Sequence, residues 1–186
     1  SILLPYYGIQ VLSGVKSFRD NPVLGSQALN RRGLHSWRVV CAARLTAQRR
    51  EKLRHLVPEV ERRFFEEHGY IERSDFLPPD EFRKLVAEVE NLAAPAREMT
   101  EGSTITRRMP VPPGVLRDAP AIRAFLCDRR WSDMVRYVGG FDVEPVVTIQ
   151  TIIATPPRTM RERDPQTRLH IDTFHSTAKA WLFLHD

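Results

Sequence analysis

Two residues near the C-terminal end of the sequence have the types and the spacing of metal ligands. His170 and Asp172 lie two positions apart in a stretch, Leu169 to His175, whose pattern predicts a β-strand. Side chains alternate across a strand, so residues i and i+2 share a face, about 6–7 Å apart at the backbone. Such a pair can bind one metal ion from two sides. It matches part of the 2-His-1-carboxylate facial triad, which holds Fe(II) and leaves coordination positions open.

The H-x-D tripeptide is short, and a plainer interpretation also applies to it. A His and an Asp in a strand can simply make ordinary hydrogen bonds. A closed structural zinc site is not favoured, because it needs four protein ligands and Cys41 and Cys127 lie far apart in the sequence. The tripeptide alone does not distinguish a metal site from ordinary hydrogen bonding, so the surrounding sequence has to be considered.

Length and composition indicate one globular domain. The 186 residues are 42% hydrophobic and 27% charged, and the net charge is +5. This length and hydrophobic content are enough for a sizeable core. Arginine pairs are scattered along the chain. Without a nucleic-acid-binding motif beside them, solvated helix faces are favoured over a nucleic-acid surface. We therefore expect no nucleic-acid partner.

The sequence also bears on the cellular compartment. Two cysteines in this length indicate no disulfide framework and a reducing environment. No apolar run approaches the ~18 residues of a membrane span. Ser1 to Pro5 lacks the basic region and the long apolar stretch of a signal peptide. A cytoplasmic protein with no membrane span is expected.

The first part of the chain is predicted to be irregular. Glycines and prolines interrupt every periodic pattern in residues 1–45, which indicates an extended arm packed on the domain. Tyr6, Tyr7 and Trp37 are the candidate anchors of this arm.

Helical patterns follow. One begins near Thr46, a plausible N-cap, is broken or kinked at Pro58 and ends at Gly69. The clearest helix starts at Pro79 and carries one apolar stripe: Phe82, Leu85, Val86, Val89 and Leu92.

The second half of the chain changes from helical to strand patterns. A strand is expected at Thr104 to Arg108, and two helices are expected to begin at Asp118 and Ser132, the second ending at Gly139-Gly140. The β-branched run from Val146 to Ile153 predicts a further strand. Lys179 to Leu184 would pair with the H-x-D strand as a hairpin. Helices first and strands later indicate an α+β fold with helices outside an antiparallel sheet or barrel.

Gln150 is the polar exception in the β-branched run. It either faces the same space as His170 and Asp172 or lies on an edge strand facing water, and the sequence leaves both open.

Three blocks of the sequence resemble the phytanoyl-CoA dioxygenase-like family of Fe(II)/2-oxoglutarate oxygenases. The first runs from Phe64 through Gly69-Tyr70 to Glu81, ahead of the amphipathic helix. The second is the helix pair that ends in Val138-Gly139-Gly140. The third and most specific is His170-Ile171-Asp172-Thr173-Phe174-His175 followed by Lys179 to Leu184. The resemblance covers about residues 60–186.

The resemblance implies a double-stranded β-helix, or jelly roll, with its N-terminal helices packed around it. Residues 46–186 would be the N-terminal part of the dioxygenase domain, with helices in 46–140 and jelly-roll strands in 141–186. His170 and Asp172 would bind Fe(II). The third ligand, a later His, and the Arg that meets 2-oxoglutarate are expected beyond Asp186, so the barrel would be incomplete in this chain.

The resemblance also implies cosubstrate contacts. Gln150 matches a position that hydrogen-bonds 2-oxoglutarate in some relatives, and Trp181 matches an aromatic position in the same pocket. Lys179 could meet a carboxylate, or it could be an exposed lysine at a hairpin.

The function implied is hydroxylation of a small organic molecule of lipid or secondary-metabolite type, with 2-oxoglutarate and O₂ consumed and succinate and CO₂ released. A non-catalytic jelly-roll protein that binds a ligand or partner is the alternative. A halogenase of the same fold is disfavoured, because Asp172 occupies the position that would have to be a small residue.

Overall fold

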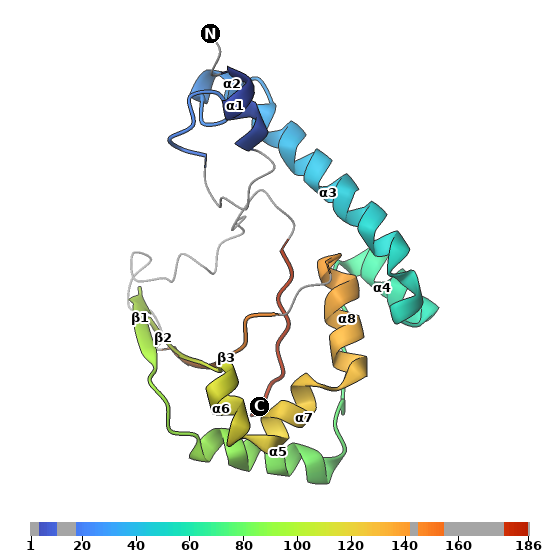
Figure 1. Ribbon diagram of the computed structural model, residues 1–186, viewed down its shortest axis with the longest axis vertical. Coiled ribbons are helices and arrows are strands. Elements are labelled where there is room, and N and C mark those ends of the chain that lie inside the picture. Colours follow the sequence, from blue (N-terminus) through green and yellow to red (C-terminus); the bar gives the residue numbers. More distant parts are fainter. Residues whose placement is uncertain (1–3, 11–17, 142–144, 155–176, 186) are drawn as a thin grey trace.

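The computed structural model describes residues 4–10, 18–141, 145–154 and 177–185. It combines helices with one small antiparallel sheet of three strands in the order β1-β2-β3, which is open rather than closed into a barrel (Figure 1). The expected combination of helices with an antiparallel sheet is thus confirmed. None of the helices in these ranges has the length and hydropathy required to span a bilayer.

Most of the described residues in 1–45 lie in helices, and this differs from the predicted irregular arm. These helices are α1 (Leu4–Ile9), α2 (Gln27–Arg31) and the long α3 (Leu34–Lys52). Of the three expected anchors, Tyr6 is 60% and Trp37 63% exposed, whereas Tyr7 is half-buried. Figure 1 shows these helices at one end of the molecule, with α3 leading from them to the remaining elements.

A buried asparagine and a buried arginine organise this end of the chain. Asn21 donates to the carbonyl of Tyr7 at 3.0 Å and accepts from the backbone N–H of Leu24 at 2.7 Å. Arg38 on α3 donates to the carbonyl of Leu24 at 3.0 Å and lies over the Phe18 ring. These contacts link the segment before α2 to both neighbouring helices, and no residue periodicity signals them.

The helix predicted to start at Thr46 starts twelve residues earlier. Thr46 is 2% exposed in the middle of α3, and its hydroxyl donates to the carbonyl of Ala42 at 2.9 Å. A threonine can make this bond in a helix as readily as it can cap one. Consequently α3 runs without interruption across residue 45, where the sequence suggested a change from arm to domain.

The break at Pro58 is confirmed. After α3 come a short 3-10 helix (Arg54–Leu56) and then α4 (Glu59–His68), with Pro58 immediately before α4. Gly69 ends α4 in the left-handed conformation, φ 79°, and its N–H donates to Phe65 O. Glycine adopts this conformation without the Cβ clash that other residues incur, which explains the helix end.

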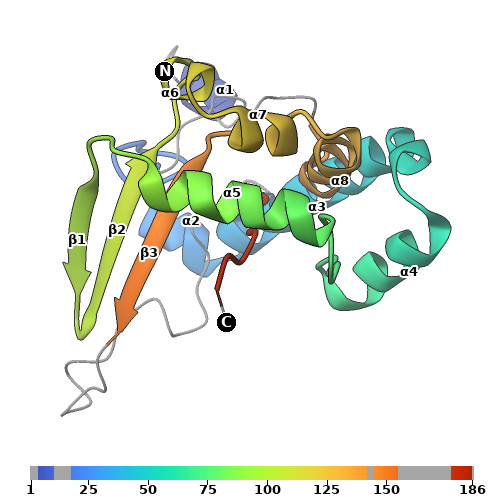
Figure 2. The same ribbon diagram turned by 90° about the horizontal axis from the view of Figure 1, so that it is seen from below.

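The next helix, α5 (Pro79–Asn91), agrees with its prediction. Leu85 is 3% exposed, and Phe82, Val89 and Leu92 pack against the same cluster. This main core also contains Ile122 and Phe125 from α7 (Pro120–Leu126), which lies against α5 (Figure 2). A short α6 (Pro113–Arg117) precedes α7.

The cap of α7 was predicted incorrectly. The N-cap position is Ala119 rather than Asp118 and offers no side-chain acceptor. Instead the Glu88 carboxylate, on α5, accepts from the backbone N–H groups of Ala121 at 3.0 Å and Ile122 at 2.7 Å. A carboxylate suits a helix N-terminus wherever it comes from in the chain.

The next helix, α8 (Arg129–Gly139), begins three residues before the predicted Ser132. Asp128 is its N-cap and accepts from the N–H of Arg130 at 2.8 Å. Gly140 ends the helix in the left-handed conformation, as the Gly139-Gly140 pair predicted. Its buried residue is Tyr137, which forms a second, smaller cluster with Val57 and Phe65.

The sheet consists of β1 (Arg97–Glu101), β2 (Thr104–Pro110) and β3 (Thr148–Ala154). The last two were predicted, whereas β1 was not, because its sequence REMTE has no strand pattern. It forms as a hairpin partner of β2 through the turn Gly102-Ser103, where Gly102 adopts φ 59°. The second edge of β3 pairs with no strand in the described ranges.

The predicted hairpin strand from Lys179 to Leu184 is not present as a strand. Residues 177–185 are not assigned to a strand and pair with none of the three described strands, and side chains of this segment pack on the main core. Leu182 and Leu184 pack on the main core, while Trp181 and Phe183 are 62% and 79% exposed. The alternation of a strand is therefore retained without a ladder of hydrogen bonds to any of the described strands.

Candidate active site

The two proposed iron ligands lie outside the described residues. His170 and Asp172 belong to residues 155–176, as does His175. Their assignment as ligands stays a prediction. Within the described ranges no group of three or more His, Cys, Asp or Glu side chains is placed to hold a metal ion.

Gln150 lies in the middle of β3, directly opposite Arg108 of β2. The Arg108 Nε donates to the Gln150 Oε1 at 2.9 Å, and both side chains are exposed. Arg97 of β1 is in turn opposite Arg108. Residues directly opposite each other share a sheet face, so the three side chains form one polar row.

The neighbour of Gln150 shows which face this row occupies. Ile149 packs against the main core, and successive residues of a strand point to opposite faces. Gln150 therefore lies on the face away from that contact. In the structure the Gln150 side chain is exposed to solvent and bonded to Arg108. Its contact with 2-oxoglutarate stays a prediction.

Arg108 becomes a candidate site residue through its bond to Gln150, which the sequence did not predict. The Arg107-Arg108 pair was assigned to solvated faces. Arg107 fits that assignment, since it pairs with Glu98 across the hairpin at 2.6 Å. Arg108 differs, because its bonded acceptor is a neutral amide and no ion pair to it occurs in the described part of the chain. Alternation along β2 was the available signal, since it separates the two arginines onto opposite faces.

Lys179 and Trp181 are both exposed on the C-terminal segment, whose Leu182 and Leu184 pack on the main core. Their shared contact with 2-oxoglutarate stays a prediction. His185, at the end of this segment, places its Nε2 3.5 Å from Glu90 Oε1 on α5, and this contact is at the surface.

Large apolar side chains remain exposed on the strand and the segment that were expected to flank the site. Val146 is 94%, Ile152 60% and Phe183 79% exposed. The second edge of β3 also pairs with none of the described strands, so this part of the molecule combines exposed apolar side chains with a sheet edge to which a further strand could add.

No family model, curated protein or solved structure matches the chain. The resemblance to the oxygenase family therefore rests on the three sequence blocks alone.

Proposed function

We propose that the chain is part of an Fe(II)/2-oxoglutarate-dependent dioxygenase that hydroxylates a small organic molecule. His170 and Asp172 are assigned as two of the three iron ligands, and a later His is expected to be the third. The proposed fold is a jelly roll in which β1, β2 and β3 are part of the barrel wall.

The structural observation that supports the proposal is that β3 has a sheet edge to which a further strand could add. Strand β3 carries Gln150, its second edge is unpaired in the described ranges, and Ile152 beside Gln150 is 60% exposed. A strand containing His170 and Asp172 could add to this edge by antiparallel pairing, and that would bring the predicted ligands beside Gln150.

Each assigned residue has a distinct physical role. The bound iron and 2-oxoglutarate supply the O₂-dependent hydroxylation, while the protein supplies ligands, orientation and a dry pocket. His170 offers a neutral imidazole and Asp172 a carboxylate, a donor set that suits Fe(II). The amide of Gln150, oriented by its bond to Arg108, and the ammonium of Lys179 are assigned to the cosubstrate. Trp181 would line the same pocket and exclude water.

The proposal is tested by iron content and turnover in the full-length protein. Purified protein is loaded with Fe(II), and 2-oxoglutarate-dependent succinate release is measured across a panel of lipid and secondary-metabolite substrates. His170→Ala and Asp172→Ala should each lose bound iron and succinate release. His175→Ala is the matched control, since three residues beyond Asp172 it is not expected on the ligand face.

Two outcomes would contradict the proposal. If His175→Ala lost iron as fully as His170→Ala, the ligand assignment would be wrong. If the protein bound no iron and released no succinate with any substrate, the alternative of a non-catalytic jelly-roll protein that binds a ligand or partner would be favoured.

A further inference from the structure

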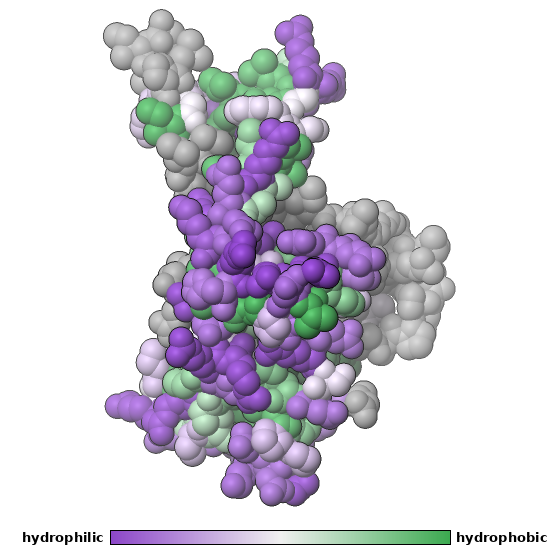
Figure 3. All heavy atoms as spheres, turned by 90° about the vertical axis from the view of Figure 1, so that its right-hand side faces the viewer, coloured by the Kyte–Doolittle hydropathy of each residue, from purple (hydrophilic) through white to green (hydrophobic). Residues whose placement is uncertain are grey.

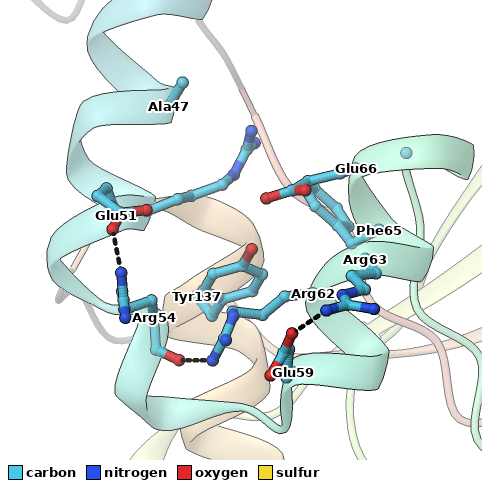
Figure 4. A pocket seen from close by; sticks show the side chains of 11 residues that line it. Ala47, Glu51, Arg54, Glu59, Arg62, Arg63, Phe65, Glu66 and Tyr137 are labelled. Atoms are coloured by element: carbon cyan, nitrogen blue, oxygen red, sulfur yellow. Dashed lines mark hydrogen bonds and ion pairs between the residues drawn. The ribbon is translucent and has the colours of Figure 1, made fainter.

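A depression of about 790 Å³ opens on the surface between α3, α4 and α8, away from the sheet (Figure 4). Its lining combines a phenol with charged side chains, among them Arg50, Arg54, Arg62, Arg63, Glu66 and Tyr137. Figure 3 views this side of the molecule and shows hydrophilic side chains gathered over it. None of these residues takes part in the proposed oxygenase chemistry.

The phenol of Tyr137 forms the floor of the depression. Tyr137 is 3% exposed, and its ring packs edge-on against Phe65 at a centroid distance of 5.7 Å. Its hydroxyl makes no hydrogen bond in the described part of the chain, and Figure 4 shows it pointing toward Glu66 in the space between α3 and α4. Burial raises the pKa of Tyr137. The hydroxyl oxygen is not shut off from solvent, so the neutral phenol can donate to an acceptor bound in the depression.

The surrounding arginines divide into two kinds. Arg54 pairs with Glu51 at 2.8 Å, and Arg63 pairs with Glu59, so their charges are compensated. Arg62, by contrast, donates through Nη1 to the backbone carbonyl of Arg54 at 2.8 Å and has no carboxylate partner in the described ranges.

Arg50 is of this second, uncompensated kind. Its Nε donates to the carbonyl of Val138 at 3.0 Å, and its guanidinium lies over the Phe65 ring at 4.7 Å. Burial lowers the pKa of Arg50, because its cation is partly desolvated. A guanidinium held in this way still presents its terminal N–H groups, and their planar geometry matches carboxylate and phosphate oxygens.

Glu66 contributes the opposite charge. Its carboxylate has no ion-pair or hydrogen-bond partner in the part of the chain that the structure describes, and it lies close enough to act on the pKa of Tyr137, as do Arg50 and Arg62. The depression thus offers two uncompensated cations, one neutral donor and one free acceptor.

We propose that this depression binds a small organic anion that also carries a donor group. The phosphate or carboxylate of the ligand binds Arg50, Arg62 and the Tyr137 hydroxyl, while an ammonium or hydroxyl group of the ligand donates to Glu66. The charge of α3, which borders the depression, favours an anion as well, because this helix contains five Lys or Arg and one Glu. Such an excess attracts anions at long range.

A matched set of four probes tests the proposal in the full chain. Isothermal titration calorimetry compares phosphoethanolamine with ethyl phosphate and β-alanine with propionate. Within each pair the anionic group is the same and only one member carries an ammonium group. The first pair carries a phosphate and the second a carboxylate. We expect saturable binding, with the ammonium-bearing member of the preferred pair about fivefold tighter, as one charge-assisted hydrogen bond implies.

Three variants locate the binding. Tyr137→Phe keeps the ring and should weaken binding about tenfold, as should Arg62→Gln. Glu66→Gln disturbs none of the helix contacts described above and should abolish the preference for the ammonium-bearing probe. Arg83→Gln is the control, because it removes an exposed arginine on α5 that is outside the depression. Thermal unfolding establishes that each variant is folded.

The proposal is overturned if no probe saturates. It is equally overturned if folded Tyr137→Phe and Arg62→Gln bind like Arg83→Gln, because attraction would then reflect net charge alone. A preference for ammonium that persists in Glu66→Gln would reject the role of that carboxylate.

Discussion

The carboxylate of Glu88 on α5 lies 2.7 Å from the backbone nitrogen of Ile122, at the start of α7. It also accepts from the N–H of Ala121, so one side chain satisfies two of the N–H groups that a helix start leaves unbonded. The contact spans 34 positions in the chain and joins two helices of the main core.

Replacing Glu88 should therefore destabilise the protein. Glu88→Ala leaves both N–H groups without their acceptor, and we expect a loss of about 1–2 kcal/mol in the free energy of unfolding. Urea denaturation measures it. The control is Glu90→Ala on the same helix. The Glu90 carboxylate is at the surface, so this substitution should change the free energy of unfolding by less than about 0.5 kcal/mol. Equal effects of the two substitutions would contradict the capping role.

Leu85 tests the packing of the main core. It is 3% exposed, so Leu85→Ala removes a buried side chain and leaves a cavity, at a cost of about 2–5 kcal/mol. Val60→Ala on α4 is the comparison, because Val60 is 74% exposed and should change stability little. Unchanged thermal unfolding of Leu85→Ala would show that α5 is placed incorrectly.

Asp128 should make stability depend on pH in the acid range. Its hydrogen bond with Arg130 holds the pKa of Asp128 below its ordinary value of 3.8. The carboxylate's contribution is then fully present above pH 3.8 and is lost as the pH falls through the lower folded-state pKa. Asp128→Asn keeps a capping acceptor without the charge. Its stability deficit should be clear at neutral pH and should shrink in strong acid, and a deficit that grew on acidification would contradict this assignment.

Tyr137 should make stability depend on pH at the alkaline end. Because burial raises the pKa of Tyr137 above its ordinary 10.0, the neutral phenol is favoured in the folded state. Its contribution is present below pH 10.0 and is lost as the pH rises through the folded-state pKa. Tyr137→Phe cannot ionise, so its stability relative to the native chain should improve above pH 10.0. Urea unfolding at neutral and alkaline pH measures this, and a constant difference would count against burial as the cause.

Gln150 tests the cosubstrate assignment within the proposed function. Gln150→Ala removes the amide beside Arg108 and should raise the 2-oxoglutarate concentration needed for half-maximal succinate release, while iron content stays the same. Thr151→Ala is the control, since Thr151 lies next to Gln150 on the opposite sheet face. If both variants had the native requirement, Gln150 would have no contact with the cosubstrate.

Several features of this protein follow from its sequence without knowledge of the fold. The stripe through Leu85, the helix ends at Gly69 and Gly140, and the strand containing Gln150 were all predictable. Each depends on a local cause, either a periodic apolar pattern or a glycine that accepts a left-handed conformation. The pairing of His170 with Asp172 is likewise a prediction from spacing, and it continues to depend on the sequence alone.

Other features were decided by contacts between distant parts of the chain. The polar segment β1 forms a strand because it pairs with β2. Helix α7 starts after a residue without a capping side chain because Glu88 supplies the acceptor. The cation of Arg50 and the phenol of Tyr137, 87 positions apart, line one depression only because α3 and α8 pack together. Local patterns report what one segment prefers, whereas hydrogen-bond partners from remote segments become available only when the tertiary structure forms.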